Sequence, residues 1–173
     1  MKAKNGTPKL GMERKALELR VMPDRILRET CTDVVEFNNQ LESLAARMPV
    51  FMKEVNGIGL AAPLAGVLRP LVVLDTPDSK QVLVNPQFSM ISSDLDTRTE
   101  GRLSIPGEMY NVTRFFRIEV RARDIEGKAL HFTAQDLHAR VIRHESDHLN
   151  GMLIRDGVHG GPPELHNENS GID

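Results

Sequence analysis

Residues 144–148 have the sequence His-Glu-Ser-Asp-His, and this short stretch governs how the rest of the chain is interpreted. It falls within a helix expected over residues 134–150. Residues four apart lie on one helical face, so the imidazoles of His144 and His148 can reach the same divalent ion. Glu145 lies beside them, where its carboxylate can take a proton from an attacking water. The spacing therefore predicts a metal-dependent hydrolytic site.

The apolar residues of the same helix indicate which way the histidines point. Leu137 and Val141 lie on the histidine stripe, so this face is expected to turn toward the core. Buried imidazoles and a buried carboxylate need partners, and a metal ion is the commonest one for this trio. The alternative is a chance match, since the pattern fixes only three positions and such side chains are often solvated.

Hydrolytic metal sites normally use three protein ligands and keep one position open. Downstream of the motif, the sixth position after the second histidine is Ile154, which cannot bind a metal. Glu168 falls about twenty residues on, but it lies in a tail rich in Pro, Gly and Asn with no helix to hold it. The third ligand is therefore expected upstream.

An earlier helix is expected to begin at Asn39 as N-cap, with Glu42 completing a capping box, and to end at Gly57. Strands are expected over residues 71–75, 81–84, 116–123 and 129–133, where apolar and β-branched residues cluster or alternate. Strands first and a central helix last predict an α+β fold, with antiparallel sheet around the helix that carries the motif.

Length and composition limit the class of protein. With 173 residues, the chain is expected to form one domain over residues 15–157, with a flexible arm at 1–14 and a flexible tail at 158–173. A net charge of -2 and scarce aromatic residues argue against a nucleic-acid or anionic-membrane partner. The lone Cys31 suits a reducing compartment. A cytoplasmic location is expected, with an organelle reached through a short N-terminal transit sequence as the alternative.

Three ordered motifs resemble those of the peptide deformylase family. Residues 57–64 read Gly-Ile-Gly-Leu-Ala-Ala-Pro-Leu, residues 100–106 read Glu-Gly-Arg-Leu-Ser-Ile-Pro, and residues 144–148 complete the set. The pair Asn85-Pro86 between the first two motifs and the segment 20–28 are also similar to the family. The resemblance covers about residues 16–157 and implies the peptide-deformylase fold.

The resemblance implies hydrolysis of the formyl group from N-formylmethionyl peptides. It places a divalent metal, Fe²⁺ or Zn²⁺, on His144 and His148, and makes Glu145 the residue that moves the proton of the attacking water. It also places Gly59 along the site and makes the backbone N–H of Leu103 a donor to the oxyanion. Some family members contact the ribosome through a C-terminal helix. The tail here reads Gly-Gly-Pro-Pro at 160–163, so docking by that route is not expected.

Two positions depart from the family pattern. Arg102 stands where the family has the cysteine that binds the metal, and Leu64 stands where it has the glutamine that holds the oxyanion. A guanidinium cannot be deprotonated, so an anionic ligand is replaced by a cation. A unit charge pair about 4 Å apart interacts by roughly 4 kcal/mol at an effective dielectric near 20, so the metal is expected to be weakly bound or absent. Removing one oxyanion donor costs about 10²–10³ in rate.

No other residue clearly replaces the missing thiolate. Cys31, His131 and His138 are expected to be structural or to face elsewhere, and Glu100 is not a metal ligand in the family pattern. We expect Arg102 to pair with Glu145 or with a bound anion, with a solvated arginine as the alternative.

Two functions follow from these departures. The first is a deformylase-like hydrolase with impaired or lost activity. The second is an inert homologue that binds a peptide or a small anionic ligand.

Overall fold

The computed structural model describes residues 16–101, 103–104, 107 and 109–154. The expected N-terminal arm and C-terminal tail, the outer limits of the expected domain, and Arg102 lie outside these residues. In the described part of the chain, no helix is long and apolar enough to cross a membrane.

The first long helix, α1, spans Asn39–Glu54 and begins one residue earlier than expected. Its N-cap is Asn38, whose side-chain oxygen accepts hydrogen bonds from the backbone N–H groups of Gln40 (3.1 Å) and Leu41 (3.2 Å). The expected cap at Asn39 and its capping box with Glu42 are therefore wrong. Both asparagines can cap a helix, and only the backbone conformation determines which one does.

The end of α1 also differs from the expected one. Asn56, with φ 57°, adopts the left-handed conformation that had been assigned to Gly57. The N–H of Asn56 bonds the carbonyl of Lys53, and the N–H of Gly57 bonds that of Met52. This is the Schellman pattern, shifted by one residue because asparagine tolerates the left-handed region.

A five-stranded antiparallel sheet has the order β1-β2-β3-β6-β7. Its strands are β1 (Gly59–Ala61), β2 (Leu71–Thr76), β3 (Ser79–Met90), β6 (Arg117–Arg123) and β7 (Ala129–Gln135). The four expected strands are confirmed. β3 runs further than expected because Asn85, with φ 51°, forms an irregularity at which pairing changes from β2 to β6. The Asn85-Pro86 pair, noted above only for its similarity to the family, forms this bulge.

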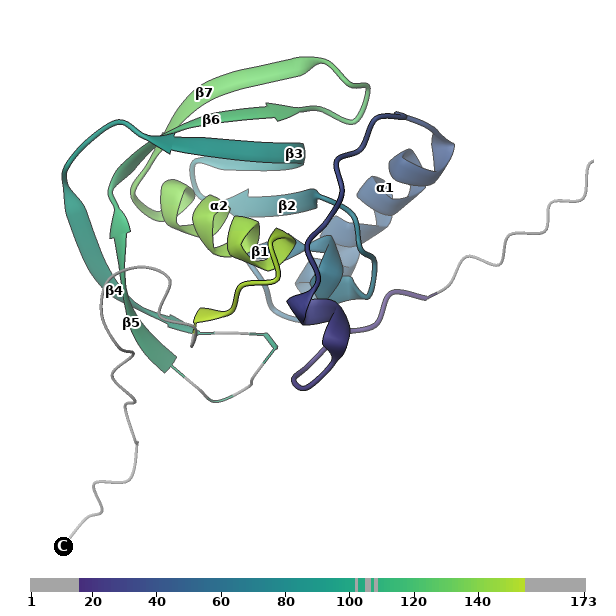
Figure 1. Cartoon of the computed structure of the whole chain (residues 1–173), viewed down its shortest axis with the longest axis horizontal. Coiled ribbons are helices and arrows are strands. Elements are labelled where there is room, and N and C mark those ends of the chain that lie inside the picture. The colour runs from purple at the N-terminus through teal and green to yellow at the C-terminus, as the bar shows by residue number, and fades with distance from the viewer. Residues whose placement is uncertain (1–15, 102, 105–106, 108, 155–173) are drawn as a thin grey trace, which may run out of the picture.

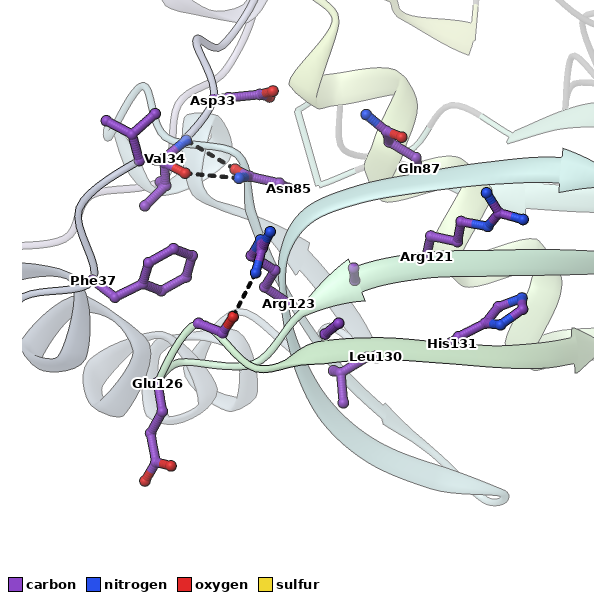
Figure 2. Close-up of a pocket in the computed structure, with 14 residues that line it drawn as sticks. Asp33, Val34, Phe37, Asn85, Gln87, Arg121, Arg123, Glu126, Leu130 and His131 are labelled. Atoms are coloured by element: carbon purple, nitrogen blue, oxygen red, sulfur yellow. Dashed lines mark hydrogen bonds between the residues drawn. The ribbon is translucent and has the colours of Figure 1, made fainter.

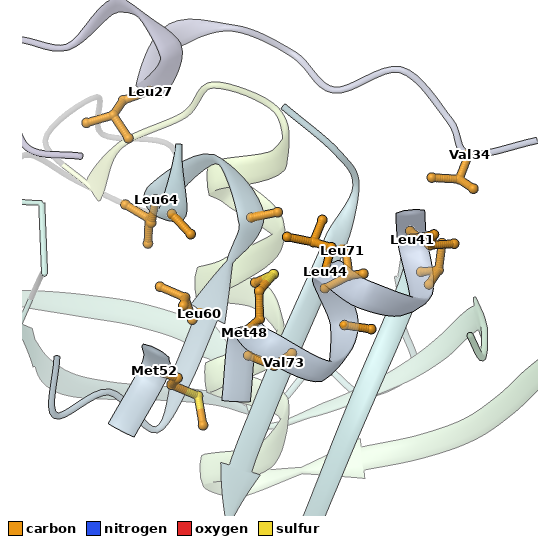
Figure 3. Packing of buried hydrophobic residues seen from close by; sticks show 14 of the residues in the cluster. Leu27, Val34, Leu41, Leu44, Met48, Met52, Leu60, Leu64, Leu71 and Val73 are labelled. Carbon is orange, nitrogen blue, oxygen red and sulfur yellow. The ribbon is translucent and has the colours of Figure 1, made fainter. Parts of the chain in front are cut away.

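Strand β2 separates two hydrophobic clusters, as Figure 1 shows by its place between α1 and α2. Leu71 and Val73 pack with α1 in the first cluster, shown in Figure 3. Val72 and Leu74, one position on in each case, pack in the second cluster with α2. Because successive side chains of a strand point to opposite faces, one strand serves both halves of the core.

Strands β4 (Leu95–Gly101) and β5 (Met109–Phe115) form a separate two-stranded antiparallel ribbon that was not expected. Few of its residues are buried apolar ones. Its cross-strand contacts are polar, including Thr97 with Thr113 (2.8 Å) and Thr99 with Asn111 (3.0 Å). A ribbon held by such pairs lacks the apolar alternation that identifies strands in a sequence.

The closing helix α2 spans Asp136–Leu149, shorter at its start than expected because residues 134–135 belong to β7. In Figure 1 the helix lies within the curve of the large sheet, with the β4–β5 ribbon at one end. His148 is 3% exposed, and Val141 is buried. The expected α+β fold, with antiparallel sheets around a helix whose histidines turn inward, is confirmed.

Candidate active site

Helix α2 brings the two histidines of the motif together. The Nε2 atoms of His144 and His148 lie 3.3 Å apart, and the two rings meet edge to face with centroids 5.1 Å apart. Nitrogens this close and on one side of a helix can share one divalent ion. The pair therefore fits the metal that the motif predicts.

Glu100, at the end of β4, orients His144. The Nδ1 of His144 donates to Oε2 of Glu100 across 2.8 Å, which directs Nε2 toward His148. This is the usual role of a carboxylate behind a metal-binding histidine. Glu100 contacts the nitrogen of His144 that faces away from the pair, so it does not take the place of the missing thiolate ligand.

Two buried arginines hold Glu100 in turn. Arg114 on β5 donates from Nε and Nη2 to the two carboxylate oxygens (2.7 and 2.9 Å), and Arg140 on α2 donates from Nη1 (2.6 Å). Arg114 also bonds Asp147 of α2 at 3.1 Å. The network thus fastens the β4–β5 ribbon to the helix that carries the histidines.

The network shifts the pKa values of its members. Burial opposes ionisation of Glu100, but hydrogen bonds from His144 and Arg114 outweigh burial and hold the pKa of Glu100 well below its usual range. Burial alone would lower the pKa of His144. The hydrogen bond to Glu100 and the charge of Glu145 reverse this, so the pKa of His144 lies above its ordinary value.

Glu145 is 5% exposed and lies beneath β1. Burial raises its pKa to about 6, while a hydrogen bond from the Ala61 backbone and the nearby His144 act against this rise. Its Oε2 atom has no hydrogen-bond partner among the residues that the structure describes. A buried carboxylate with one open oxygen and a pKa near neutrality suits a group that accepts and returns a proton.

Gly59 is placed beside Glu145 by close packing. A Cβ atom at this position would lie 2.5 Å from Cγ1 of Val141 and 2.8 Å from Oε1 of Glu145. Real Cβ atoms do not come so near, so only glycine allows β1 to approach the helix here. The role of Gly59 along the site remains a prediction.

Leu64 lies in the short 3₁₀ helix η2 (Ala62–Ala65) and is 2% exposed. Its side chain packs in the first hydrophobic cluster, where Figure 3 shows it beside Leu27 and Leu60. Its backbone carbonyl accepts a hydrogen bond from the N–H of Arg20 (2.8 Å). The side chain is a core residue and offers no donor to a ligand.

The second motif is only partly described. Leu103 is half-buried and packs against the first cluster. Arg102 lies outside the described residues, and so does any pairing between it and Glu145, which remains a prediction. Glu168 is also outside them. Within the part of the chain that the structure describes, no group of three His, Cys, Asp or Glu residues is arranged to hold a metal.

The remaining candidates lie away from the histidine pair. His138 on α2 bonds the hydroxyl of Thr76 (3.0 Å), and His131 on β7 pairs with Glu119 (2.8 Å). Cys31 is half-buried, and burial raises the pKa of its thiol to about 11. Among the described residues, no hydrogen bond or ion pair joins any of the three to His144 or His148.

The arginine network is the part of the site that sequence reasoning missed. Its members had a detectable signal, because Arg114 occupies an inward position of β5, where Tyr110 and Val112 are also buried. A charged residue at a core position must have a partner. The partner itself, Glu100 on another strand, could not be identified from spacing.

Fold and site together define a scaffold in which an antiparallel sheet surrounds a helix with an inward-facing His-Glu-x-x-His motif. The chain matches the family model described as polypeptide deformylase over residues 16–161. The peptide deformylase of Synechococcus sp. (strain CC9605) is 40% identical over 158 residues, which are 87% of this chain and 78% of that protein. That of Dictyoglomus thermophilum is 41% identical over 140 residues, 80% of this chain and 90% of that protein.

Solved structures of peptide deformylases are similar to this chain as well. The crystal structure of the Thermotoga maritima peptide deformylase has a TM-score of 0.79 and 32% identity, covering 85% of this chain and 99% of that one. The Synechococcus elongatus peptide deformylase in complex with actinonin has a TM-score of 0.77 and 36% identity, covering 84% of this chain and 82% of that one. The chain belongs to the peptide deformylase family.

Proposed function

We propose that this chain is a peptide-deformylase-like metallohydrolase whose activity on N-formylmethionyl peptides is impaired or lost. Family membership and the convergent Nε2 atoms of His144 and His148 support the hydrolase. The observation that carries the impairment is Leu64, a buried core side chain at the position where the family places an oxyanion donor. Arg102 in the sequence supports it independently.

In the proposed reaction, His144 and His148 hold a divalent metal, Fe²⁺ or Zn²⁺. When bound, such an ion polarises the formyl oxygen and makes water a stronger nucleophile. Glu145 takes a proton from the attacking water and returns it to the leaving amine as the formyl C–N bond breaks. The products are formate and a peptide with a free amino terminus. Gly59 leaves room beside Glu145, and the backbone N–H of Leu103 donates to the oxyanion.

The arginine network explains why the site keeps its geometry despite the two substitutions. Glu100 is held by Arg114 and Arg140, and it orients His144 through Nδ1. None of these contacts requires position 102 or 64. A well-ordered histidine pair can therefore persist in a chain that has lost a ligand and an oxyanion donor.

The alternative is an inert homologue that binds a peptide or a small anionic ligand. Two features favour it: the guanidinium of Arg102 in the second motif, and the raised pKa of His144. The guanidinium of Arg102 adds positive charge at the position where the family has a thiolate, and the raised pKa favours the cationic form of the His144 ring. The Synechococcus elongatus relative has been solved in complex with actinonin, so actinonin is a suitable probe of the corresponding cleft here.

Formate release from a formyl-Met peptide tests the proposal. The chain would be purified without oxygen and supplied with Fe²⁺, Ni²⁺ or Zn²⁺, beside the variants Arg102→Cys, Leu64→Gln and the double variant. We expect little or no formate release from the unmodified chain and recovery of activity in the double variant. Adding Leu64→Gln to Arg102→Cys should raise the rate about 10²–10³-fold over Arg102→Cys alone. An Arg121→Cys variant controls for the mere addition of a thiol.

Three outcomes separate the hypotheses. Metal-dependent release by the unmodified chain at rates typical of the family would contradict the proposed impairment. Recovery in the double variant supports a deformylase scaffold limited by these two positions. Absence of activity in every variant, with actinonin bound by the unmodified chain without added metal, favours the inert homologue.

A further inference from the structure

The N-terminal segment 18–22 contacts two separate parts of the candidate active site. The backbone N–H of Arg20 donates to the carbonyl of Leu64 in η2 (2.8 Å). Two residues on, the backbone N–H of Met22 donates to the carbonyl of Ser104 in the second motif (3.1 Å). Alternate residues donate, as they do along the edge of a β-strand. One short segment therefore joins the first motif to the second.

The contact of this segment with η2 involves more than one bond. The backbone N–H of Glu18 also donates to the carbonyl of Ala65, at 3.5 Å. The side chain of Arg20 lies so close to Gly66, the residue that ends η2, that a Cβ atom on the glycine would be 2.6 Å from its Nε. An ion pair with Asp24 at 3.5 Å holds the same guanidinium. Backbone and side chain thus both fix the segment to η2.

The contact with the second motif is one buried hydrogen bond. Ser104 is 1% exposed, so water is kept from its carbonyl, and losing a buried partner is costly. Among the described residues, no other backbone hydrogen bond joins the loop between β4 and β5 to a different segment. Leu103, directly before Ser104, packs its side chain on the first hydrophobic cluster. The bond from Met22 therefore fixes the backbone beside the N–H of Leu103.

We propose that segment 18–22 positions the oxyanion site, a role that rests on the proposed function. By holding both carbonyls, the segment sets the distance between η2, which carries position 64, and the N–H of Leu103. An oxyanion donor is effective only over a narrow range of distance and direction, so a small displacement weakens transition-state stabilisation. Met22 is thus a positioning residue, which acts through Ser104 and does not touch the reacting atoms.

Replacing the backbone N–H of Met22 with an ester oxygen tests this role without changing a side chain. The full chain can be assembled by ligating a synthetic piece, residues 1–30, to a ¹⁵N-labelled piece that begins at Cys31, the only cysteine of the sequence. We expect the ester to shift the amide signal of Leu103 and to lower the order parameter of its N–H bond. The amide of Val120, in the middle of β6, should keep its signal.

The catalytic measurement uses the double variant with Arg102→Cys and Leu64→Gln. In that background the Met22 ester should lower kcat for formate release about tenfold, the usual effect of one hydrogen bond, and leave KM close to its value. The two constants separate because an oxyanion donor acts in the transition state. A bond with a purely structural role would lower stability without separating kcat from KM at temperatures where the protein stays folded.

Two controls remove a comparable hydrogen bond elsewhere. An ester at Asp24 deletes the N–H that donates to the carbonyl of Val21 (2.9 Å), a carbonyl that becomes part of the ester in the test protein. Asn85→Asp deletes the donor to the carbonyl of Val34 (2.8 Å), in the contact drawn in Figure 2, which includes no residue of the three motifs. Both controls should lower stability and leave the second motif and kcat unchanged.

The two measurements also separate this role from the proposed function. An unchanged Leu103 signal in the Met22 ester, or equal effects of the Met22 and Asp24 esters, would overturn the positioning role. An unchanged kcat in an active double variant would overturn it as well. Absence of formate release from the double variant contradicts the proposed function instead, and the Leu103 signal then decides the positioning role by itself.

Discussion

Glu100 is the residue on which most of the candidate site depends. It accepts hydrogen bonds from Arg114, Arg140 and His144 while being 8% exposed. Three donors around one carboxylate make the ionised form stable in spite of burial. The same carboxylate determines which nitrogen of His144 faces His148.

Glu100→Gln tests this role. The amide keeps the shape but removes the charge, so the two arginines lose a buried counterion, and we expect a loss of about 3–5 kcal/mol in the free energy of unfolding. Zn²⁺ affinity should fall by about 10–100-fold, since the support of His144 is weakened. Urea denaturation and competition with a chelating dye measure the two effects.

Glu119→Gln is the control for that prediction. Glu119 pairs with His131 and Arg121 on the solvent side of the sheet. Its loss should leave both the stability and the Zn²⁺ binding close to those of the unmodified chain, because solvent screens exposed ion pairs. Equal effects of the two substitutions would mean that Glu100 has no special role.

At the scale of elements, the start of α1 depends on a choice between two adjacent asparagines. Asn38→Ala should destabilise the protein by about 1 kcal/mol, because the N–H groups of Gln40 and Leu41 lose their acceptor. Asn39→Ala should be close to neutral or slightly stabilising, since alanine is the better helix former. Denaturant midpoints of the two variants give a direct comparison, and the reverse order would place the cap at Asn39.

The N-terminal end of α2 provides a pH-dependent contact with the β2–β3 hairpin. His138 is 6% exposed and bonds Thr76, whose hydroxyl also donates to the carbonyl of Ser79. Burial lowers the pKa of His138, with Asp78 acting in the opposite direction. A histidine with a lowered pKa in the folded state stabilises the fold in its neutral form, and this contribution is lost as pH falls below its unfolded value, about 6.5.

His138→Asn isolates that contribution. The unmodified chain should exceed the variant in stability by the largest margin above about pH 7, and the margin should shrink toward pH 5.5. Both proteins retain Glu100 and Glu145. Subtracting their free energies of unfolding therefore cancels the contribution of those two carboxylates. Chemical denaturation at several pH values measures the margin. A margin that grows on acidification would show that the folded state favours the protonated ring.

At the scale of the whole molecule, the two hydrophobic clusters meet at β2. Met48 on α1 belongs to the first cluster and Ile142 on α2 to the second, and each is at most 1% exposed. Because β2 contributes alternate residues to the two clusters, both clusters pack against the same sheet. We expect the domain to unfold as one cooperative unit.

Met48→Ala and Ile142→Ala test this cooperativity. Each should cost about 2–5 kcal/mol through lost burial and the cavity that remains. In each variant, the far-UV circular dichroism signal and the hydrogen exchange of amides in the unsubstituted cluster should report the same unfolding transition. Two separate transitions would show that the α1 and α2 halves unfold independently.

The sequence by itself determined the features that depend on near neighbours. Helix α2 with its inward histidines follows from spacing of three and four residues, and the paired strands β6 and β7 follow from alternation around the turn at 124–127. Three ordered motifs were enough to indicate the family. Even the errors at α1, one residue at each end, arose because two adjacent residues could serve as the cap.

Tertiary structure alone decided the contacts between distant segments. Glu100 and His144 are 44 residues apart, and their hydrogen bond exists because the polar β4–β5 ribbon is fastened to α2. The bulge at Asn85 likewise depends on how β3 pairs first with β2 and then with β6. Local patterns show which face of an element is buried. They do not show what that face meets, because each long-range contact depends on the packing of the whole chain.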